Sequence, residues 1–207
     1  MKRFIAIFLT LIITIPFLVS CGDDEDNVSD TGATASVQLD TSVTYYADIE
    51  IANYGTITVQ LDPVAAPITV KNFIDLANSG FYNGLTFHRI IEGFMMQGGD
   101  PDGNGTGGSG KNIVGEFAAN GYSNTIAHKR GVISMARANP YNSASSQFFI
   151  MHGDAPSLDG YYAAFGKVVS GLEVVDEVCT SAQPIDRNGT IPYNQQPVIT
   201  SIKIRTK

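Results

Sequence analysis

Short stretches in which apolar and polar residues alternate recur along the chain, and they limit its fold more than any other feature of the sequence. In Thr44–Ile51 every odd-numbered residue is apolar, so these side chains share one face of a strand. Ile57, Val59 and Leu61 repeat the alternation after the turn signal at Asn53–Gly55. Two short alternating runs joined by a tight turn predict an antiparallel hairpin.

Six further segments fit short strands, which brings the predicted number to eight. They are Phe87–Ile91, Phe94–Gln97, Val132–Met135, Phe148–Met151, Ala163–Val169 and Val198–Arg205. The first two are separated by Glu92-Gly93, which is a second turn signal, so we expect them to form another hairpin.

Two segments change to the helical period. In Pro67–Ser79 the apolar residues recur at i, i+3, i+4 and i+7, and the proline at the start and Gly80 at the end suit a helix. A second helix is predicted to begin at Ser170, because Ser170–Glu173 fits a capping box. Eight strands and two helices predict one mainly β domain, a closed eight-stranded antiparallel β-barrel capped by the two helices.

The first 20 residues have the composition of an export signal rather than of a folded domain. Lys2 and Arg3 precede the apolar run Phe4–Val19, which is short for a spanning helix of ~20 residues. The run ends in LVSC at Leu18–Cys21, which resembles the lipoprotein box of bacteria. That resemblance implies that Cys21 carries fatty acyl chains and becomes the new N-terminus. An ordinary signal peptide with an incidental cysteine is the alternative.

Residues 21–43 form a predicted spacer between the lipid and a folded domain that covers residues 44–207. The spacer begins with the acidic residues of Asp23–Asp26 and continues with Ser, Thr, Gly and Ala, so we expect it to be disordered. About 20 flexible residues reach ~25 Å from a bilayer. The formal net charge is −7, which disfavours nucleic acid as a partner and leaves membrane attachment to the acyl chains.

Arg89 is a cation among apolar residues in FHRIIEGFMMQGGD, the segment Phe87–Asp100. Periodicity alone predicts a core hairpin in which Arg89 pairs with a carboxylate. The amino-acid sequence of the segment resembles the signature of the cyclophilin-type peptidyl-prolyl cis/trans isomerases. Two more blocks resemble that family in the same order and at compatible spacing: GVISMARANPYNSASSQFFI at Gly131–Ile150, and LDG with FGKV between Leu158 and Val168. The resemblance covers about residues 44 to 207.

Isomerisation of a prolyl bond makes a specific demand on the protein. Rotating the bond breaks amide resonance against a barrier of ~18–20 kcal/mol, but it makes or breaks no covalent bond. The twisted transition state has a pyramidal prolyl nitrogen with a free lone pair, so a donor aimed at that nitrogen stabilises it more than either ground state. A guanidinium stays charged and presents donors in a rigid fork. The resemblance assigns this catalytic role to Arg89.

The resemblance also assigns the substrate-binding residues. The proline ring would enter an apolar pocket, while polar groups grip the carbonyl and amide groups on either side of the proline. The pocket residues are Phe94, Met95, Phe149 and Leu158, the gripping groups are Gln97 and the backbone of Ala136 and Arg137, and Gln147 lines the same groove. Phe94 and Met95 are neighbours, so the backbone must bend there for both to face the pocket.

Three positions depart from the family's commonest eukaryotic members. Ser157 stands where those proteins have a tryptophan that helps to bind cyclosporin, so we expect weak cyclosporin binding. Tyr162 replaces their pocket histidine, and its aromatic ring with a hydrogen-bonding tip should preserve activity. Arg137 replaces an asparagine. We expect little loss there, because that position works mainly through its backbone.

Other motifs carry weaker signals. Gly103–Gly108 matches GxGxxG, but no βαβ unit surrounds it. Asp100–Gly105 matches the first half of an EF-hand loop, but Lys111 stands where the bidentate glutamate should be. The three histidines lack metal-ligand spacing and support no Ser/His/Asp arrangement, and we expect His88 to be packed or hydrogen-bonded within its hairpin. Cys179 should be buried on a helix. We therefore predict no cofactor and no metal.

These observations predict a monomeric prolyl isomerase, anchored by lipid to a bacterial membrane outside the cytoplasm, that acts on proline-containing exported polypeptides. One alternative is a module that binds prolyl segments without catalysis. The other is a structural envelope lipoprotein that only shares the fold. Arg89 separates the enzyme from the module, because a donor that acts only on the twisted bond changes turnover rather than affinity.

Overall fold

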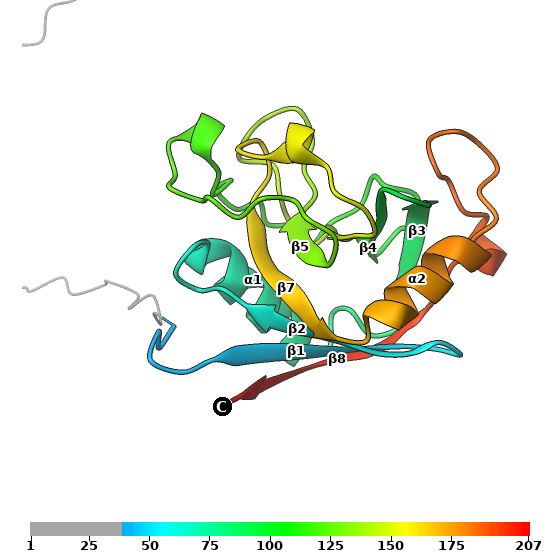
Figure 1. Ribbon diagram of the computed structural model, residues 1–207, viewed down its shortest axis with the longest axis horizontal. Helices are drawn as coiled ribbons and strands as arrows, with labels where there is room; N and C mark the ends of the chain where they lie inside the picture. The colour runs from blue at the N-terminus through cyan, green and yellow to red at the C-terminus, as the bar shows by residue number, and fades with distance from the viewer. Residues whose placement is uncertain (1–38) are drawn as a thin grey trace, which may run out of the picture. The chain divides into compact units, whose positions relative to one another are not determined.

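The computed structural model describes residues 39–207, which form eight strands, two α-helices and three short 3-10 helices (Figure 1). The strands are β1 (Tyr45–Ile51), β2 (Gly55–Leu61), β3 (Thr86–Ile91), β4 (Met95–Asp100), β5 (Val132–Met135), β6 (Phe148–Met151), β7 (Ala164–Ser170) and β8 (Ile199–Thr206). The helices are α1 (Pro67–Asn78) and α2 (Leu172–Ser181), and the 3-10 helices are Ala118–Asn120, Pro156–Leu158 and Tyr193–Gln195. The predicted export signal, the predicted lipidation site Cys21 and the predicted spacer up to residue 38 lie outside the described residues. Within residues 39–207, no helix is both long enough and apolar enough to cross a membrane.

All eight strands belong to one curled antiparallel sheet with the order β3-β4-β6-β5-β7-β2-β1-β8 (Figure 1). The mainly β prediction is therefore confirmed, but the closed barrel is not. The edge strands β3 and β8 share no continuous ladder in the described part of the chain. The start of β3 and the start of β8 meet at an isolated bridge between Thr86 and Val198. Backbone hydrogen bonds also join them there, from the Gly84 N–H to the Ile199 carbonyl at 2.8 Å, from the Ile199 N–H to the Leu85 carbonyl at 2.7 Å and from the Phe87 N–H to the Pro197 carbonyl at 2.9 Å.

The rest of the β3 edge is occupied by a different segment, which explains the incomplete closure. The Ile90 N–H donates to the Gly189 carbonyl at 2.8 Å, and the Ile191 N–H donates to the His88 carbonyl at 2.9 Å. Residues 189–191 therefore take the hydrogen-bonding positions that β8 would need. The sheet forms a curled half-barrel, and the loop before β8 becomes part of its wall.

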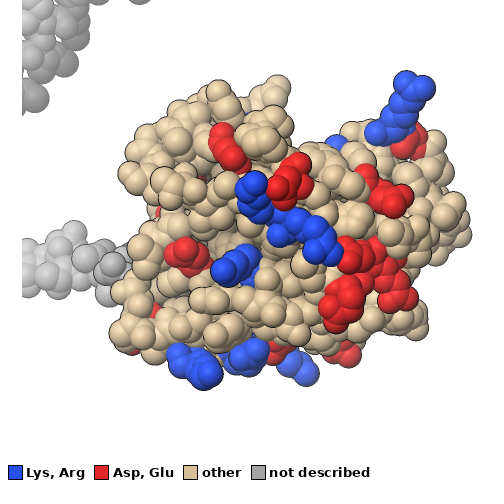
Figure 2. All heavy atoms as spheres, in the orientation of Figure 1, with Lys and Arg blue, Asp and Glu red and all other residues tan. Residues whose placement is uncertain are grey.

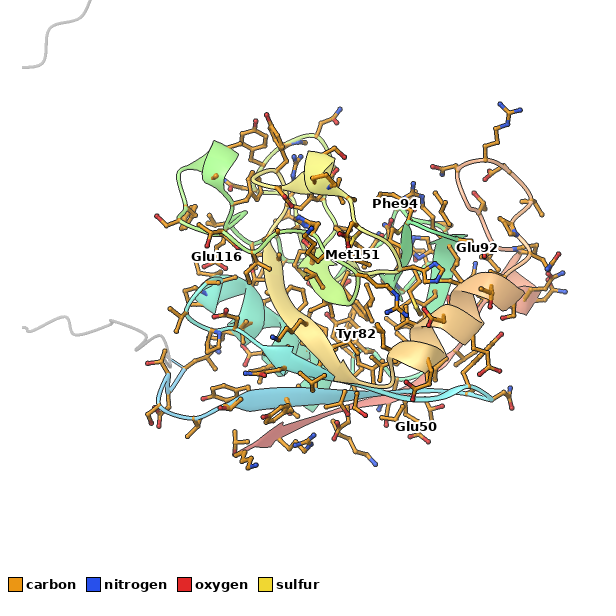
Figure 3. All side chains as sticks on the ribbon, viewed as in Figure 1. Glu50, Tyr82, Glu92, Phe94, Glu116 and Met151 are labelled. Atoms are coloured by element: carbon orange, nitrogen blue, oxygen red, sulfur yellow. The ribbon has the colours of Figure 1, made fainter. Side chains whose placement is uncertain are left out.

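Alternation in the sequence gives the sheet its buried inner face. On β1 and β2 the alternating apolar residues are buried, except that Tyr45 at the start of β1 is half-buried. Helix α1 adds Phe73, which is fully buried and meets the Phe148 ring edge-on, with ring centroids 5.5 Å apart and planes at 88°. Tyr82, labelled in Figure 3, is buried beside them and donates its hydroxyl to the Ser146 carbonyl at 3.0 Å. Burying each such ring contributes about 1.5–3 kcal/mol.

Helix α2 begins differently from the prediction. Ser170 is the last residue of β7, and the N-cap is Gly171, which makes no side-chain capping hydrogen bond and has φ = 81°. A side chain at Gly171 would clash with the Thr56 carbonyl, so the close approach of β2 selects glycine here. The predicted capping box is therefore wrong. Cys179 lies buried on α2 as expected, and burial raises the pKa of its thiol to about 12.

Candidate active site

Three neighbouring strands bring the predicted catalytic residue to its partners. Arg89 on β3 is paired directly with Gln97 on β4, and Gln97 is paired with Phe149 on β6. The turn between β3 and β4 places Gly93 at φ = 76° and leaves Phe94 outside the strand, while Met95 is the first residue of β4. This bend lets the neighbours Phe94 and Met95 line the same pocket, as the sequence required.

A pocket of about 160 Å³ opens where these strands meet. Its lining contains nine of the ten predicted site residues: Arg89, Phe94, Met95, Gln97, Ala136, Arg137, Phe149, Leu158 and Tyr162. Met95 and Phe149 form its apolar floor and belong to a small buried cluster that also contains Met151, which is labelled in Figure 3. Phe148, the neighbour of Phe149, points to the opposite face of β6 and packs in the main core. The pocket has the size and apolar floor that a proline ring needs.

The Arg89 guanidinium is held by neutral groups. Its Nε donates to the Asn188 carbonyl at 2.7 Å, and Nη1 donates to Gln97 Oε1 at 3.2 Å and lies 3.9 Å from Met95 Sδ. No ion pair of Arg89 with any residue in 39–207 is present, so the carboxylate partner of the simplest interpretation is absent from this part of the chain. Burial lowers the pKa of Arg89, but Tyr162 and Asp186 oppose that effect.

The side chains of Gln97 and Gln147 extend the hydrogen-bond chain that begins at Arg89. The Gln97 Nε2 donates to Gln147 Oε1 at 2.9 Å, and the Gln147 Nε2 donates to the Gly107 carbonyl at 2.9 Å. Gln147 lines an adjoining cavity of about 410 Å³, which shares Gln97, Ala136 and Arg137 with the smaller pocket. The tenth predicted residue therefore lies next to the pocket rather than in it.

Ala136 lines both cavities. Its N–H donates to the Gln147 carbonyl at 2.9 Å and is therefore occupied. Its carbonyl oxygen has no hydrogen-bond partner within the described residues, and Ala136 lines both hollows. An extended peptide backbone in the groove can donate an N–H to this carbonyl.

A polar network around the buried ring of His128 lies next to the pocket floor and was not predicted from the sequence. His128 Nδ1 lies 2.9 Å from Asp159 Oδ1, and His128 Nε2 lies 3.1 Å from Ser134 Oγ. Ser134 is fully buried, so this Ser/His/Asp alignment offers no nucleophile to a substrate. The His128 ring stacks on Phe149 with centroids 6.0 Å apart and planes at 19°, so the network supports the pocket floor. Burial lowers the pKa of His128, although Asp159 acts in the opposite direction.

The other candidate ligand groups do not form a metal site. Among residues 39–207 no group of three or more His, Cys, Asp or Glu side chains could hold a metal ion. The Asp100 carboxylate accepts the backbone N–H groups of Asp102 at 2.9 Å and of Asn104 at 3.1 Å, so it anchors its own loop. His88 is buried as expected, but its ring nitrogens have no hydrogen-bond partner in the described chain.

Comparison with known proteins agrees with this geometry. The family described as "Cyclophilin type peptidyl-prolyl cis-trans isomerase/CLD" matches residues 46–205. Peptidyl-prolyl cis-trans isomerase B of Bacillus subtilis is 52% identical over 117 residues, which cover 56% of this chain and 78% of that protein. The peptidyl-prolyl cis-trans isomerase of Helicobacter pylori strain 26695 is 49% identical over 137 residues, 65% of this chain and 80% of its own length.

A solved structure shows the same fold. The cyclophilin-type isomerase of Cryptosporidium parvum, crystallised in the presence of the dipeptide Ala-Pro, has a TM-score of 0.68 and 33% identity, and the match covers 78% of this chain and 99% of that one. The chain belongs to the cyclophilin-type peptidyl-prolyl cis-trans isomerase family. The enzyme class predicted from the three sequence blocks, a peptidyl-prolyl cis-trans isomerase, is thereby confirmed.

Proposed function

We propose that this protein catalyses cis–trans isomerisation of X-Pro bonds in exported polypeptides, with Arg89 as the group that stabilises the twisted bond. The observation that carries the proposal is the setting of Arg89. Its guanidinium borders an apolar pocket of proline size, and its hydrogen bonds go to a carbonyl and an amide rather than to a carboxylate. A cation without a direct carboxylate partner in a partly dry site stabilises developing electron density strongly.

The steps follow from what each group offers. The proline ring enters the pocket over Met95 and Phe149, and burial of its apolar surface supplies affinity. Gln97 and the Ala136 carbonyl hold the flanking backbone, so one side of the prolyl bond can turn while the other stays fixed. In the twisted state the nitrogen lone pair becomes an acceptor, and Arg89 donates to it. A donor of this kind contributes about 2.7–4 kcal/mol, or 10²–10³ in rate.

Binding of proline-containing polypeptides is supported by the solved relative that was crystallised in the presence of Ala-Pro. In this chain the pocket continues into the adjoining cavity through shared residues, so an extended segment on one side of the proline has a place to lie. This arrangement fits a peptide backbone better than an isolated small molecule.

We propose in addition that the domain acts outside the cytoplasm as a lipoprotein. The support is the sequence of residues 1–43: a basic and apolar export signal, the LVSC box that ends at Cys21, and an acidic spacer. Stable anchoring requires two or more acyl chains, which the lipoprotein modification supplies. Cys21→Ser should release the protein from membrane pellets, and retention of that variant in the pellet would contradict the lipid anchor.

The catalytic proposal is tested by the rate of cis–trans exchange in a prolyl peptide, measured by NMR with catalytic amounts of protein. The wild type should accelerate exchange, and Arg89→Ala should lose about 100-fold in kcat/KM. Arg205→Ala is the matched control, because Arg205 is an exposed arginine paired with Asp48 on β1. A wild type that binds the peptide without accelerating exchange would establish the non-catalytic module instead.

A further inference from the structure

The Arg137 side chain lies between three aromatic rings. Its guanidinium carbon is 5.1 Å from the ring centroid of Phe117, 5.1 Å from that of Tyr141 and 4.8 Å from that of Tyr162. The Phe117 and Tyr141 rings also meet edge-on, with centroids 5.3 Å apart. These aromatic residues belong to three segments that are far apart in the sequence, so the cation joins three loops at one point.

Hydrogen bonds fix the same guanidinium to the backbone. Its Nε donates to the Tyr161 carbonyl at 3.0 Å, and Nη1 donates to the carbonyls of Ala138 at 2.9 Å and Asn139 at 3.2 Å. Between residues 39 and 207 no carboxylate forms an ion pair with Arg137. A planar fork can stack on rings and donate in its plane at the same time, which a lysine ammonium cannot do.

Tyr162 connects this cluster to the proline pocket. Its ring lies edge-on to Phe149 on the pocket floor, with centroids 5.8 Å apart and planes at 83°, and edge-on to His128 at 6.5 Å. One neighbour of the Tyr162 ring is therefore the pocket floor and another is the Arg137 guanidinium. Both residues line the pocket, and Arg137 also lines the adjoining cavity.

We propose that the Arg137 side chain is a positioning residue that fixes Tyr162 as the wall of the proline pocket and so sets peptide affinity. The inference deepens the proposed isomerase function and rests on it. It differs from the sequence-based expectation that residue 137 works mainly through its backbone. The backbone of residues 136 and 137 still faces the groove, but the guanidinium ties Tyr161, Tyr162 and Tyr141 together behind it.

The experiment compares Arg137→Gln and Arg137→Lys with the wild type in the full chain. The matched control is Arg130→Gln, because Arg130 is an exposed arginine whose Nη2 pairs with Asp176 at 2.6 Å. Three quantities are measured by NMR: the ring-proton shifts of Tyr162, and the Kd and the on-enzyme exchange rate of an Ala-Ala-Pro-Phe peptide.

Arg137→Gln should shift the Tyr162 ring signals and raise Kd about three- to fivefold, the size expected for lost cation–π contacts. The exchange rate of bound peptide should change less than twofold, because Arg89 is untouched. Arg137→Lys should recover less than half of the lost affinity, since it keeps the charge but not the fork. Arg130→Gln should leave all three quantities unchanged.

A double-mutant cycle separates positioning of Tyr162 from general loosening of the fold. In a Tyr162→Ala background, Arg137→Gln should have little further effect on Kd, because the side chain that it positions is gone. Additive losses of affinity would overturn the inference, as would unchanged Tyr162 ring signals in Arg137→Gln. The ring signals report the contact even if the wild type fails to accelerate exchange, so failure of the isomerase proposal is distinguishable from failure of this inference.

Discussion

Two arginines of the outer surface and the two arginines of the pocket are held in opposite ways. On the outer surface Arg205 pairs with Asp48 at 2.9 Å, and Arg130 pairs with Asp176 at 2.6 Å. Figure 2 shows basic side chains beside acidic ones near the middle of the face that it displays. At the pocket, Arg89 and Arg137 are held by carbonyls, an amide and aromatic rings, and neither has an ion pair in the part of the chain that the structure describes.

The neutral partners of the pocket arginines show how a fold can hold a cation in place and still leave its charge available. A carboxylate partner would offset the positive charge that acts on the prolyl nitrogen in the proposed mechanism, whereas neutral acceptors orient the guanidinium without cancelling its charge. An exposed arginine in an ion pair contributes little to stability. Replacing a surface arginine should therefore have a smaller effect than replacing one at the pocket.

The largest expected effect separates the pocket floor from the core beneath it. Phe148→Ala should lower the free energy of unfolding by about 3–5 kcal/mol, because Phe148 is fully buried among other rings. Phe149→Ala should cost less stability, since Phe149 borders the open pocket, but it should raise the peptide Kd at least about tenfold. Chemical denaturation and peptide titration of both variants measure the two effects. Equal loss of stability without loss of affinity would show that Phe149 is ordinary core.

A carboxylate placed next to Arg89 would give this pocket arginine the kind of ion pair that Arg205 and Arg130 have on the outer surface. In Gln97→Glu the new carboxylate would lie where the Gln97 amide now accepts from Arg89 Nη1 at 3.2 Å. We expect turnover at neutral pH to fall about tenfold or more, because the charge of Arg89 is offset. The guanidinium holds the pKa of the new carboxyl low, so activity should return only under acidic conditions, as the carboxyl protonates. Unchanged turnover at neutral pH would contradict the need for an unpaired cation.

Two buried histidines should make stability depend on pH. Burial lowers the pKa of both His88 and His128, so the folded state resists a proton that the unfolded chain accepts near its ordinary pKa of about 6.5. Stability should therefore be fully present above about pH 6.5 and should fall as the pH drops towards the lowered pKa values.

His88→Leu isolates one part of that dependence. It removes ring nitrogens that have no hydrogen-bond partner within residues 39–207, so stability at pH 8 should be equal or higher. The loss between pH 7 and pH 5 should become shallower, as measured by denaturation at each pH. A steeper loss than in the wild type would show that His88 does not contribute in this direction.

The smallest expected effect is on the outer surface. Asp48→Asn leaves Arg205 without its carboxylate, although Arg205 still lies 4.4 Å from the centroid of the Tyr46 ring. The free energy of unfolding should change by less than about 1 kcal/mol, and prolyl exchange should be unaffected. A loss of activity would show that charge on the outer surface affects catalysis at the pocket, which would contradict the contrast between the two regions.

Much of the fold could be predicted because its strands carry local patterns. Alternation located β1 and β2, and the i, i+3, i+4 spacing located α1 within a residue of its end. The start of α2 could not be found in this way. The residue at that position is selected by the approach of the Thr56 carbonyl from β2, and a capping-box pattern contains no information about a distant strand. Incomplete closure of the barrel had the same cause, since residues 189–191 compete with β8 for the edge of β3.

At the site, too, the residues could be predicted from the sequence, whereas the contacts between distant segments could not. The family resemblance predicted nine residues that line one pocket in the structure. It could do so because these residues stand in the short sequence blocks that resemble the family. The contacts that orient them join distant residues: Arg89 to Asn188, Arg137 to Tyr162, and His128 to Asp159. Each depends on how loops pack after the sheet has formed. The sequence alone offers no periodic signal for such contacts.

The most direct test of the central claim is the cis–trans exchange rate of a prolyl peptide held on the protein at saturation, measured beside its Kd. In Arg89→Ala the on-enzyme rate should fall about 100-fold while Kd changes less than about threefold, because Arg89 acts on the twisted bond rather than on the ground state. An on-enzyme rate that stays within twofold of the wild type, or a loss of affinity as large as the loss of rate, would contradict the claim.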